Sequence, residues 1–109
     1  RRQRQMCIRD RRYSMIKHIV MWKFKEGEHD NMLIFRDRLL ALKGQIPEIR
    51  AMEVGINMNP SDRSFDAVLV SEFDSLEALK AYSTNPLHVE VSKFCKSIRT
   101  ESHSVDYEF

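Results

Sequence analysis

Residues 16–24 read Ile-Lys-His-Ile-Val-Met-Trp-Lys-Phe, and their character alternates with the period of two that is typical of a β-strand. One face of this strand would carry Ile16, His18, Val20, Trp22 and Phe24, and the other would carry Lys17, Ile19, Met21 and Lys23. Both faces are partly apolar. We therefore expect the sheet that contains this strand to be covered on both sides.

An amphipathic helix is predicted after this strand. Gly27 ends the strand, Asp30 or Asn31 can cap the helix, and Gly44 is expected to end it in the left-handed conformation. Apolar residues recur at helical spacing on one side of this segment, namely Met32, Phe35, Leu39 and Leu42. The spacing predicts that this side packs on the sheet.

Three further strands are predicted, at residues 49–57, 65–73 and 99–109. The first two are separated by a stretch rich in turn-forming residues.

Two helices are predicted between the third and fourth strands. The first runs from about residue 75 to Tyr82, with Leu76 and Leu79 as its core pair. The second begins at Pro86 and continues to about Ser97, because proline suits the first turn of a helix.

This order, βαββαβ, predicts an α+β domain of the split βαβ or ferredoxin-like type, with a four-stranded, mainly antiparallel sheet. The helices would cover one face of the sheet. Since one domain of this size offers nothing else to cover the second face, a second copy of the chain is the expected partner. We therefore expect a homodimer.

Composition limits the function classes. The chain has 109 residues, enough for one domain, and no apolar run approaches the roughly 20 residues of a membrane span. Its formal charge of +2 is unevenly distributed, because residues 1–14 hold six arginines against one aspartate. The remaining chain is therefore net negative, which argues against nucleic acid and membranes as partners.

Residues 1–14 lack the period of the rest of the chain, and Met15 is the expected natural start. We expect residues 1–14 to be a non-native or disordered basic extension and residues 15–109 to form the domain. Cys95 is the one cysteine of that domain, so no disulfide framework is predicted. A reducing, cytoplasmic location is expected.

The run Ala-Tyr-Ser-Thr-Asn-Pro-Leu-His at residues 81–88 carries the chemistry of interest. Tyr82 and His88 are side chains that can donate and accept protons near neutral pH. If one helix ends near Thr84 and the next begins at Pro86, both side chains can be directed at one cavity. The spacing predicts a pocket without naming its ligand.

Metal and nucleotide chemistry have weak support. His18, His88 and Asp106 could form a two-histidine, one-carboxylate site, but their spacing is not diagnostic. The chain has no glycine-rich phosphate loop, cysteine cluster or serine elbow. We expect no cofactor, and leave open a divalent cation with no assigned ligands.

Several pieces of the chain occur in the order of a known family. They are residues 16–24, Ile46-Pro47, Val54-Gly55, residues 71–73, Tyr82 with Pro86-Leu87-His88, and Val105-Asp106-Tyr107. From about Met15 to Phe109 the chain resembles stress-responsive A/B barrel (Dabb) domains. The resemblance implies a dimeric α+β barrel whose biochemical role is unsettled in most members. One plant branch, similar to olivetolic acid cyclase, closes linear polyketides through a tyrosine and a histidine.

Carried over from that branch, Tyr82 and His88 would be the acid and base, and Asp106 would hold His88. The implied pocket is lined by His18, Val20, Trp22, Leu39, Ala67 and Leu69. This chain departs from the branch in having Asn85 and Ala67 where the branch has histidines, and Leu39 where it has a tyrosine. These differences argue against polyketide cyclisation itself.

Structural roles are the alternatives for the same side chains. His18 can be a hydrogen-bonded core histidine, His88 and Asp106 a pair that ties a helix to the last strand, and Tyr82 a buried ring. Three functions remain: a dimeric small-molecule-binding protein, a cofactor-independent cyclase or isomerase with His88 as general base, and a dimeric interaction module without a ligand.

Overall fold

The structure is a computed structural model that describes residues 14–109. In chain order its elements are β1 (Ile16–Phe24), α1 (His29–Ala41), the 3₁₀ turn η2 (Leu42–Gly44), β2 (Ala51–Ile56), β3 (Ala67–Phe73), α2 (Leu76–Thr84), α3 (Pro86–Ile98) and β4 (Arg99–Glu108). The predicted α+β class and order of elements are confirmed. The prediction that residues 1–14 form a non-native or disordered extension falls outside the described residues, except at Ser14.

The four strands form one antiparallel sheet in the order β2-β3-β1-β4. In its register Val20 of β1 lies between Leu69 of β3 and Ser104 of β4. β1 is thus a central strand and β4 an edge strand.

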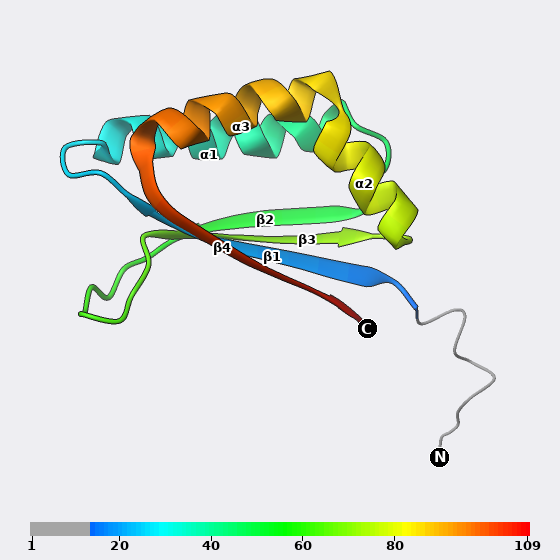
Figure 1. The fold of residues 1–109 in the computed structure, drawn as a ribbon, viewed down its shortest axis with the longest axis horizontal. Coiled ribbons are helices and arrows are strands. Elements are labelled where there is room, and N and C mark those ends of the chain that lie inside the picture. Colours follow the sequence, from blue (N-terminus) through cyan, green and yellow to red (C-terminus); the bar gives the residue numbers. More distant parts are fainter. Residues whose placement is uncertain (1–13) are drawn as a thin grey trace, which may run out of the picture.

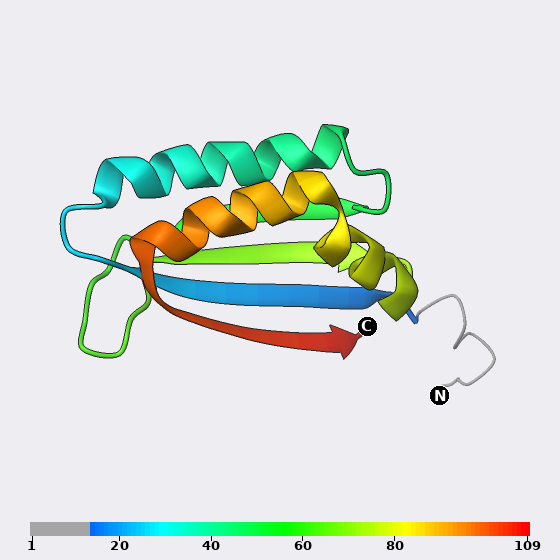
Figure 2. The ribbon, with the colours of Figure 1, turned by 45° about the horizontal axis from the view of Figure 1, so that its top comes forward.

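All three α-helices lie on one face of this sheet (Figure 1). α1 and α3 run side by side over the strands, and the shorter α2 lies near the end of the sheet where β3 finishes (Figures 1 and 2). None of the described helices combines the length and apolar character needed to cross a membrane.

The core lies between the helices and the sheet. Phe73, Tyr82, Ile46 and Leu69 are its most deeply buried large side chains. On the α1 side of the core, the rings of Trp22 and Phe35 meet edge to face, with their centroids 4.9 Å apart. The inward face predicted for residues 16–24 therefore packs against the face predicted for the first helix.

Two local predictions are wrong. Leu76 is 55% exposed, so α2 is buried through Leu79 and Tyr82 instead of through a Leu76–Leu79 pair. At 100° per residue, Leu76 points about 90° away from the direction midway between those two side chains. Gly44 does not take a left-handed conformation either, because α1 tightens into η2 and ends right-handed at Gln45.

The opposite face of the sheet is not covered by any described helix (Figure 1). Strand alternation places Ile19, Met21 and Val68 on this outer face, with Val105 and Tyr107 of β4 beside them. Met21, Val105 and Tyr107 are each at least 40% exposed. We call these five side chains the outer apolar face.

Candidate functional site

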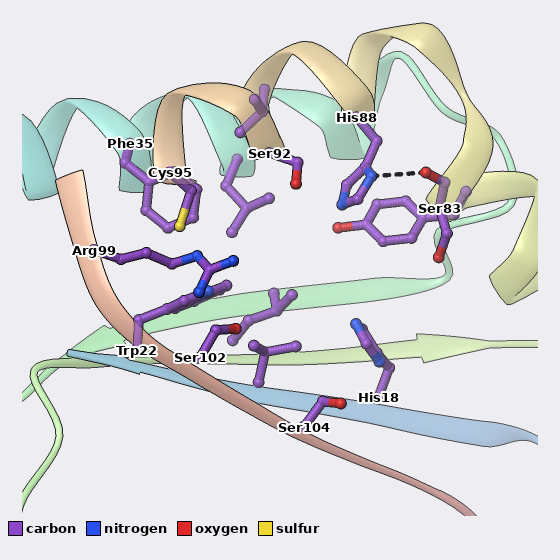
Figure 3. Close-up of a pocket in the computed structure, with 15 residues that line it drawn as sticks. His18, Trp22, Phe35, Ser83, His88, Ser92, Cys95, Arg99, Ser102 and Ser104 are labelled. Carbon is purple, nitrogen blue, oxygen red and sulfur yellow. Dashed lines mark hydrogen bonds between the residues drawn. The ribbon is translucent and has the colours of Figure 1, made fainter. Parts of the chain in front are cut away.

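A pocket of about 220 Å³ lies between the helix-covered face of the sheet and helices α1, α2 and α3 (Figure 3). Its apolar lining is Val20, Trp22, Phe35, Leu39, Leu69, Val91 and Cys95. Its polar lining is His18, Tyr82, Ser83, His88, Ser92, Arg99, Ser102 and Ser104. The pocket therefore offers both apolar and polar groups to a ligand.

The junction between α2 and α3 brings Tyr82 and His88 together. α2 ends at Thr84, and Asn85 is extended, with φ −62° and ψ 131°. The Asn85 side-chain oxygen accepts a hydrogen bond from the backbone N–H of Leu87 at 2.9 Å, which caps α3. Since the chain changes direction here, the rings of Tyr82 and His88 face each other with centroids 4.4 Å apart. The predicted helix break is confirmed, and both side chains line the same cavity.

His88 is held by backbone. Its Nδ1 lies 3.0 Å from the carbonyl oxygen of Ser83 (Figure 3). A carbonyl oxygen can only accept, so Nδ1 carries the hydrogen and Nε2 of the neutral ring is left as an acceptor. Burial lowers the pKa of His88 below its ordinary value of 6.5, although the bond to Ser83 partly opposes this. The imidazole is therefore neutral near pH 7.

Tyr82 supplies a buried phenol. The residue is only 1% exposed, and its ring packs on Phe73 at a centroid distance of 5.0 Å. Its hydroxyl has no hydrogen-bond partner among residues 14–109. Burial raises the pKa of Tyr82 well above its ordinary value, so the group stays a neutral donor. Buried polar groups are normally hydrogen-bonded, so this unpartnered hydroxyl needs an explanation.

Asp106 pairs with His18, whereas the sequence predicted that it pairs with His88. Asp106 and His18 are directly opposite on β4 and β1, and Nδ1 of His18 lies 2.5 Å from Oδ1 of Asp106. The prediction that Asp106 holds His88 is therefore wrong in this structure. The sheet register places Asp106 beside His18, whereas His88 projects from α3 on the other side of the pocket (Figure 3).

The remaining predicted pocket residues divide into two groups. Val20, Trp22, Leu39 and Leu69 line the pocket together with His18, but Ala67 does not. Ala67 lies opposite Trp22 at the start of β3 and borders a separate hollow formed by β2, β3 and the loop between them. Its placement near the end of a strand, away from α3, explains the difference.

Ser102 and Ser104 of β4 were not predicted as site residues. Ser102 and Ser104 lie opposite Trp22 and Val20, so they face the helices. The signal was present in the sequence, because a strand face that should be apolar carries Ser102, Ser104 and Asp106 at every second position. Arg99, at the start of the same strand, was also missed.

Neither Cys95 nor a metal cluster adds chemistry to the site. Burial raises the pKa of the Cys95 thiol to about 11, which makes it a poor nucleophile at neutral pH. Within the described residues, no group of three or more histidine, cysteine, aspartate or glutamate side chains is arranged to hold a metal ion. The usable groups are thus two imidazoles, a phenol, a guanidinium and several hydroxyls.

Solved structures share this fold. A dimeric ferredoxin-like protein of unknown function from Bacteroides fragilis is 38% identical, with a TM-score of 0.77 over 87% of this chain and 96% of that one. A hydroxynitrile lyase from Passiflora edulis superimposes with a TM-score of 0.80 over 89% of this chain and 94% of that one. At 19% identity, the second likeness concerns the fold alone.

Sequence comparison places the chain in a family. A stress-response A/B barrel domain-containing protein of Arabidopsis thaliana is 28% identical over 98 residues, which are 86% of this chain and about half (47%) of that protein. The sequence model of the stress responsive A/B barrel domain matches residues 16–109, which include every element of the sheet and every helix over it. The chain therefore belongs to the stress responsive A/B barrel domain family.

Proposed function

We propose that this protein is a homodimer that binds a small apolar or aromatic molecule in the pocket beneath α3. One observation carries the proposal: Tyr82 lines a cavity beside the neutral imidazole of His88, and its hydroxyl is buried with no hydrogen-bond partner among residues 14–109. Buried polar groups in proteins are normally satisfied, so a polar atom of a ligand is a fitting partner. The 220 Å³ volume suits a molecule of about one ring.

The homodimer rests on the outer apolar face. Exposed contiguous apolar patches are uncommon on monomers and mark interaction sites. The related protein from Bacteroides fragilis is described as dimeric. A second copy of the chain would remove Met21, Val105 and Tyr107 from water.

A cofactor-independent enzyme is the second candidate, and the state of His88 favours it. Nε2 is an acceptor on a neutral ring whose orientation Ser83 fixes, which is what a general base requires. Tyr82 could then hydrogen-bond an oxygen on which negative charge develops. The fold is compatible with such chemistry, because the hydroxynitrile lyase from Passiflora edulis shares it.

The test is a screen of small phenolic and other aromatic oxygen-containing compounds by thermal denaturation of the full chain. A ligand that binds only the folded protein raises its melting temperature. The rise in melting temperature that the ligand causes should be smaller in Tyr82→Phe. It should persist in Tyr107→Phe, the control, which makes the same change on the outer apolar face. If no compound shifts the melting temperature, binding of this class of molecule is wrong and the interaction module without a ligand is favoured.

The compounds that bind in this screen can then be used to test whether the protein also catalyses a reaction. Incubated with the protein, they should be recovered unchanged if the site only binds, and converted if it catalyses. Loss of a general base typically lowers the rate about 10²- to 10⁴-fold, so His88→Ala would abolish conversion while ligand affinity and dimerisation persist. His29→Ala, which changes an exposed histidine at the start of α1 and outside the pocket, is the control.

A further inference from the structure

The polar lining of the pocket includes one positive charge. Arg99 is the first residue of β4, and its side chain extends into the pocket between Cys95 and Trp22 (Figure 3). Ser102 and Ser104 follow on the same strand and also line the pocket. A guanidinium and two hydroxyl groups, all able to donate hydrogen bonds, are therefore presented from one strand.

This charge is not balanced by the lining. Arg99 is the one permanently charged side chain among the residues that line the pocket, and no aspartate or glutamate is among them. No carboxylate of the described residues lies within ion-pair distance of Arg99. Its neighbour Cys95 does not supply a negative charge near pH 7, because burial raises the pKa of that thiol to about 11. A half-buried guanidinium in such surroundings favours an anion.

Arg99 and Tyr82 mark two separated ends of the pocket. The Arg99 end lies near Trp22, and the Tyr82 end lies near His18, whose ring centroid is 6.3 Å from that of Tyr82. Trp22 and His18 are four residues apart on β1, which corresponds to about 13 Å along an extended strand. Leu39, Leu69 and other apolar side chains complete the lining. The shape suits a ligand with an apolar body and a polar group at each end.

We propose that the ligand of this pocket is a small apolar or aromatic carboxylic acid whose carboxylate binds Arg99, Ser102 and Ser104. Arginine matches a carboxylate with two parallel hydrogen bonds, and the serine hydroxyls can supply further donors. An oxygen at the other end of the ligand bonds the hydroxyl of Tyr82. This inference rests on the proposed function and adds the charge and orientation of the molecule bound.

The test uses two probes of nearly equal shape, 3-(4-hydroxyphenyl)propanoate and its neutral primary amide. Calorimetric titration of the full chain should show the acid binding about ten- to a hundredfold more tightly than the amide, the usual value of a hydrogen bond to a charged group. Arg99→Gln should remove that preference, and Arg99→Lys should restore it only in part, because lysine lacks the planar fork. Lys96→Gln removes an equal charge from an exposed position of α3 and should leave the preference intact.

The outcomes separate this inference from the function on which it rests. Equal affinity for acid and amide in the unaltered protein would overturn the carboxylate assignment while leaving small-molecule binding in place. An acid preference that survives in Arg99→Gln would overturn the role of Arg99. Failure of both probes to bind at millimolar concentration would contradict the carboxylate assignment and the proposed pocket function together. The comparison of the two probes in the unaltered protein stands even if Arg99→Gln does not fold.

Discussion

His18 and His88 line one pocket, but different acceptors hold them. The Asp106 carboxylate faces Nδ1 of His18, and the Ser83 carbonyl oxygen faces Nδ1 of His88. In each ring Nδ1 is engaged by its acceptor, which leaves Nε2 for a ligand. Between the two rings lies Tyr82, whose hydroxyl is the one buried side-chain polar atom without a hydrogen-bond partner in residues 14–109.

Tyr82→Phe tests whether that hydroxyl serves the ligand or the fold. Because no bond within the described protein is lost, we expect the free energy of unfolding to change by less than about 1 kcal/mol, or to rise. Urea unfolding measures this. Tyr82→Ala, which removes the packed ring as well, should cost about 3 to 5 kcal/mol. A loss of more than about 1.5 kcal/mol in Tyr82→Phe would mean that the hydroxyl bonds the protein itself.

His88 should make stability depend on pH in a defined direction. Burial lowers its pKa in the folded protein below the ordinary 6.5 that it has when unfolded, so the unfolded chain binds more protons. The stability that His88 contributes is present above pH 6.5 and is lost as pH falls through the lowered pKa. Between about pH 7 and about pH 5, the unaltered protein should therefore lose more stability in urea unfolding than His88→Gln. Parallel curves for the two proteins would refute this.

The junction of α2 and α3 is the element that makes the site. Pro86 begins α3, and a residue that precedes a proline disfavours the helical conformation, so α2 does not continue through Asn85. The Asn85 side chain then caps α3. Ser75 caps α2 in the same way by accepting from the N–H of Ala78 at 3.1 Å. Two capped helices that meet at a bend hold Tyr82 and His88 in one relative position.

Asn85→Ala removes the cap of α3 without removing a pocket side chain. We expect it to lower the free energy of unfolding by about 1 kcal/mol, the usual cost of losing a cap. Asn85→Asp keeps an acceptor at the same place and should lose little. Chemical denaturation of both variants measures the difference, and equal stability of Asn85→Ala and the unaltered protein would show that the cap contributes nothing.

At the scale of the whole molecule, the sheet has two unequal faces. The helices cover one face (Figure 2), and on the outer apolar face Met21, Val105 and Tyr107 are exposed. Ile19 and Val105 are directly opposite on β1 and β4, with Met21 two residues further along β1. A single copy of the chain therefore leaves apolar area in water that a second copy would bury.

Val105→Glu should weaken the proposed dimer, because it would bury a carboxylate in the interface without a partner. Sedimentation at micromolar concentration should show a shift from dimer to monomer. Leu76→Glu is the matched control, since Leu76 is equally exposed but lies on α2, outside the outer apolar face. An unchanged mass of Val105→Glu, or a monomeric unaltered protein, would contradict association through this face.

The sequence by itself determined the elements and the fold class. The period of two at residues 16–24, the helical spacing from Met32 to Leu42, and Pro86 after a turn-forming segment are local patterns, and local backbone chemistry fixes what they form. The meeting of Tyr82 and His88 was predicted for the same reason, since they are only six positions apart in the sequence with one helix break between them.

Only the tertiary structure decided which partners these side chains have. His18 and Asp106 are 88 residues apart, and the register of β1 with β4 makes them neighbours, so Asp106 cannot be assigned to His88 from the chain alone. Arg99 also lines the pocket because of contacts between elements, since residues of α3, β1 and β4 line it together. Spacing along a chain constrains contacts within one element, whereas contacts between elements depend on how whole surfaces pack and on the pairing register that this packing selects.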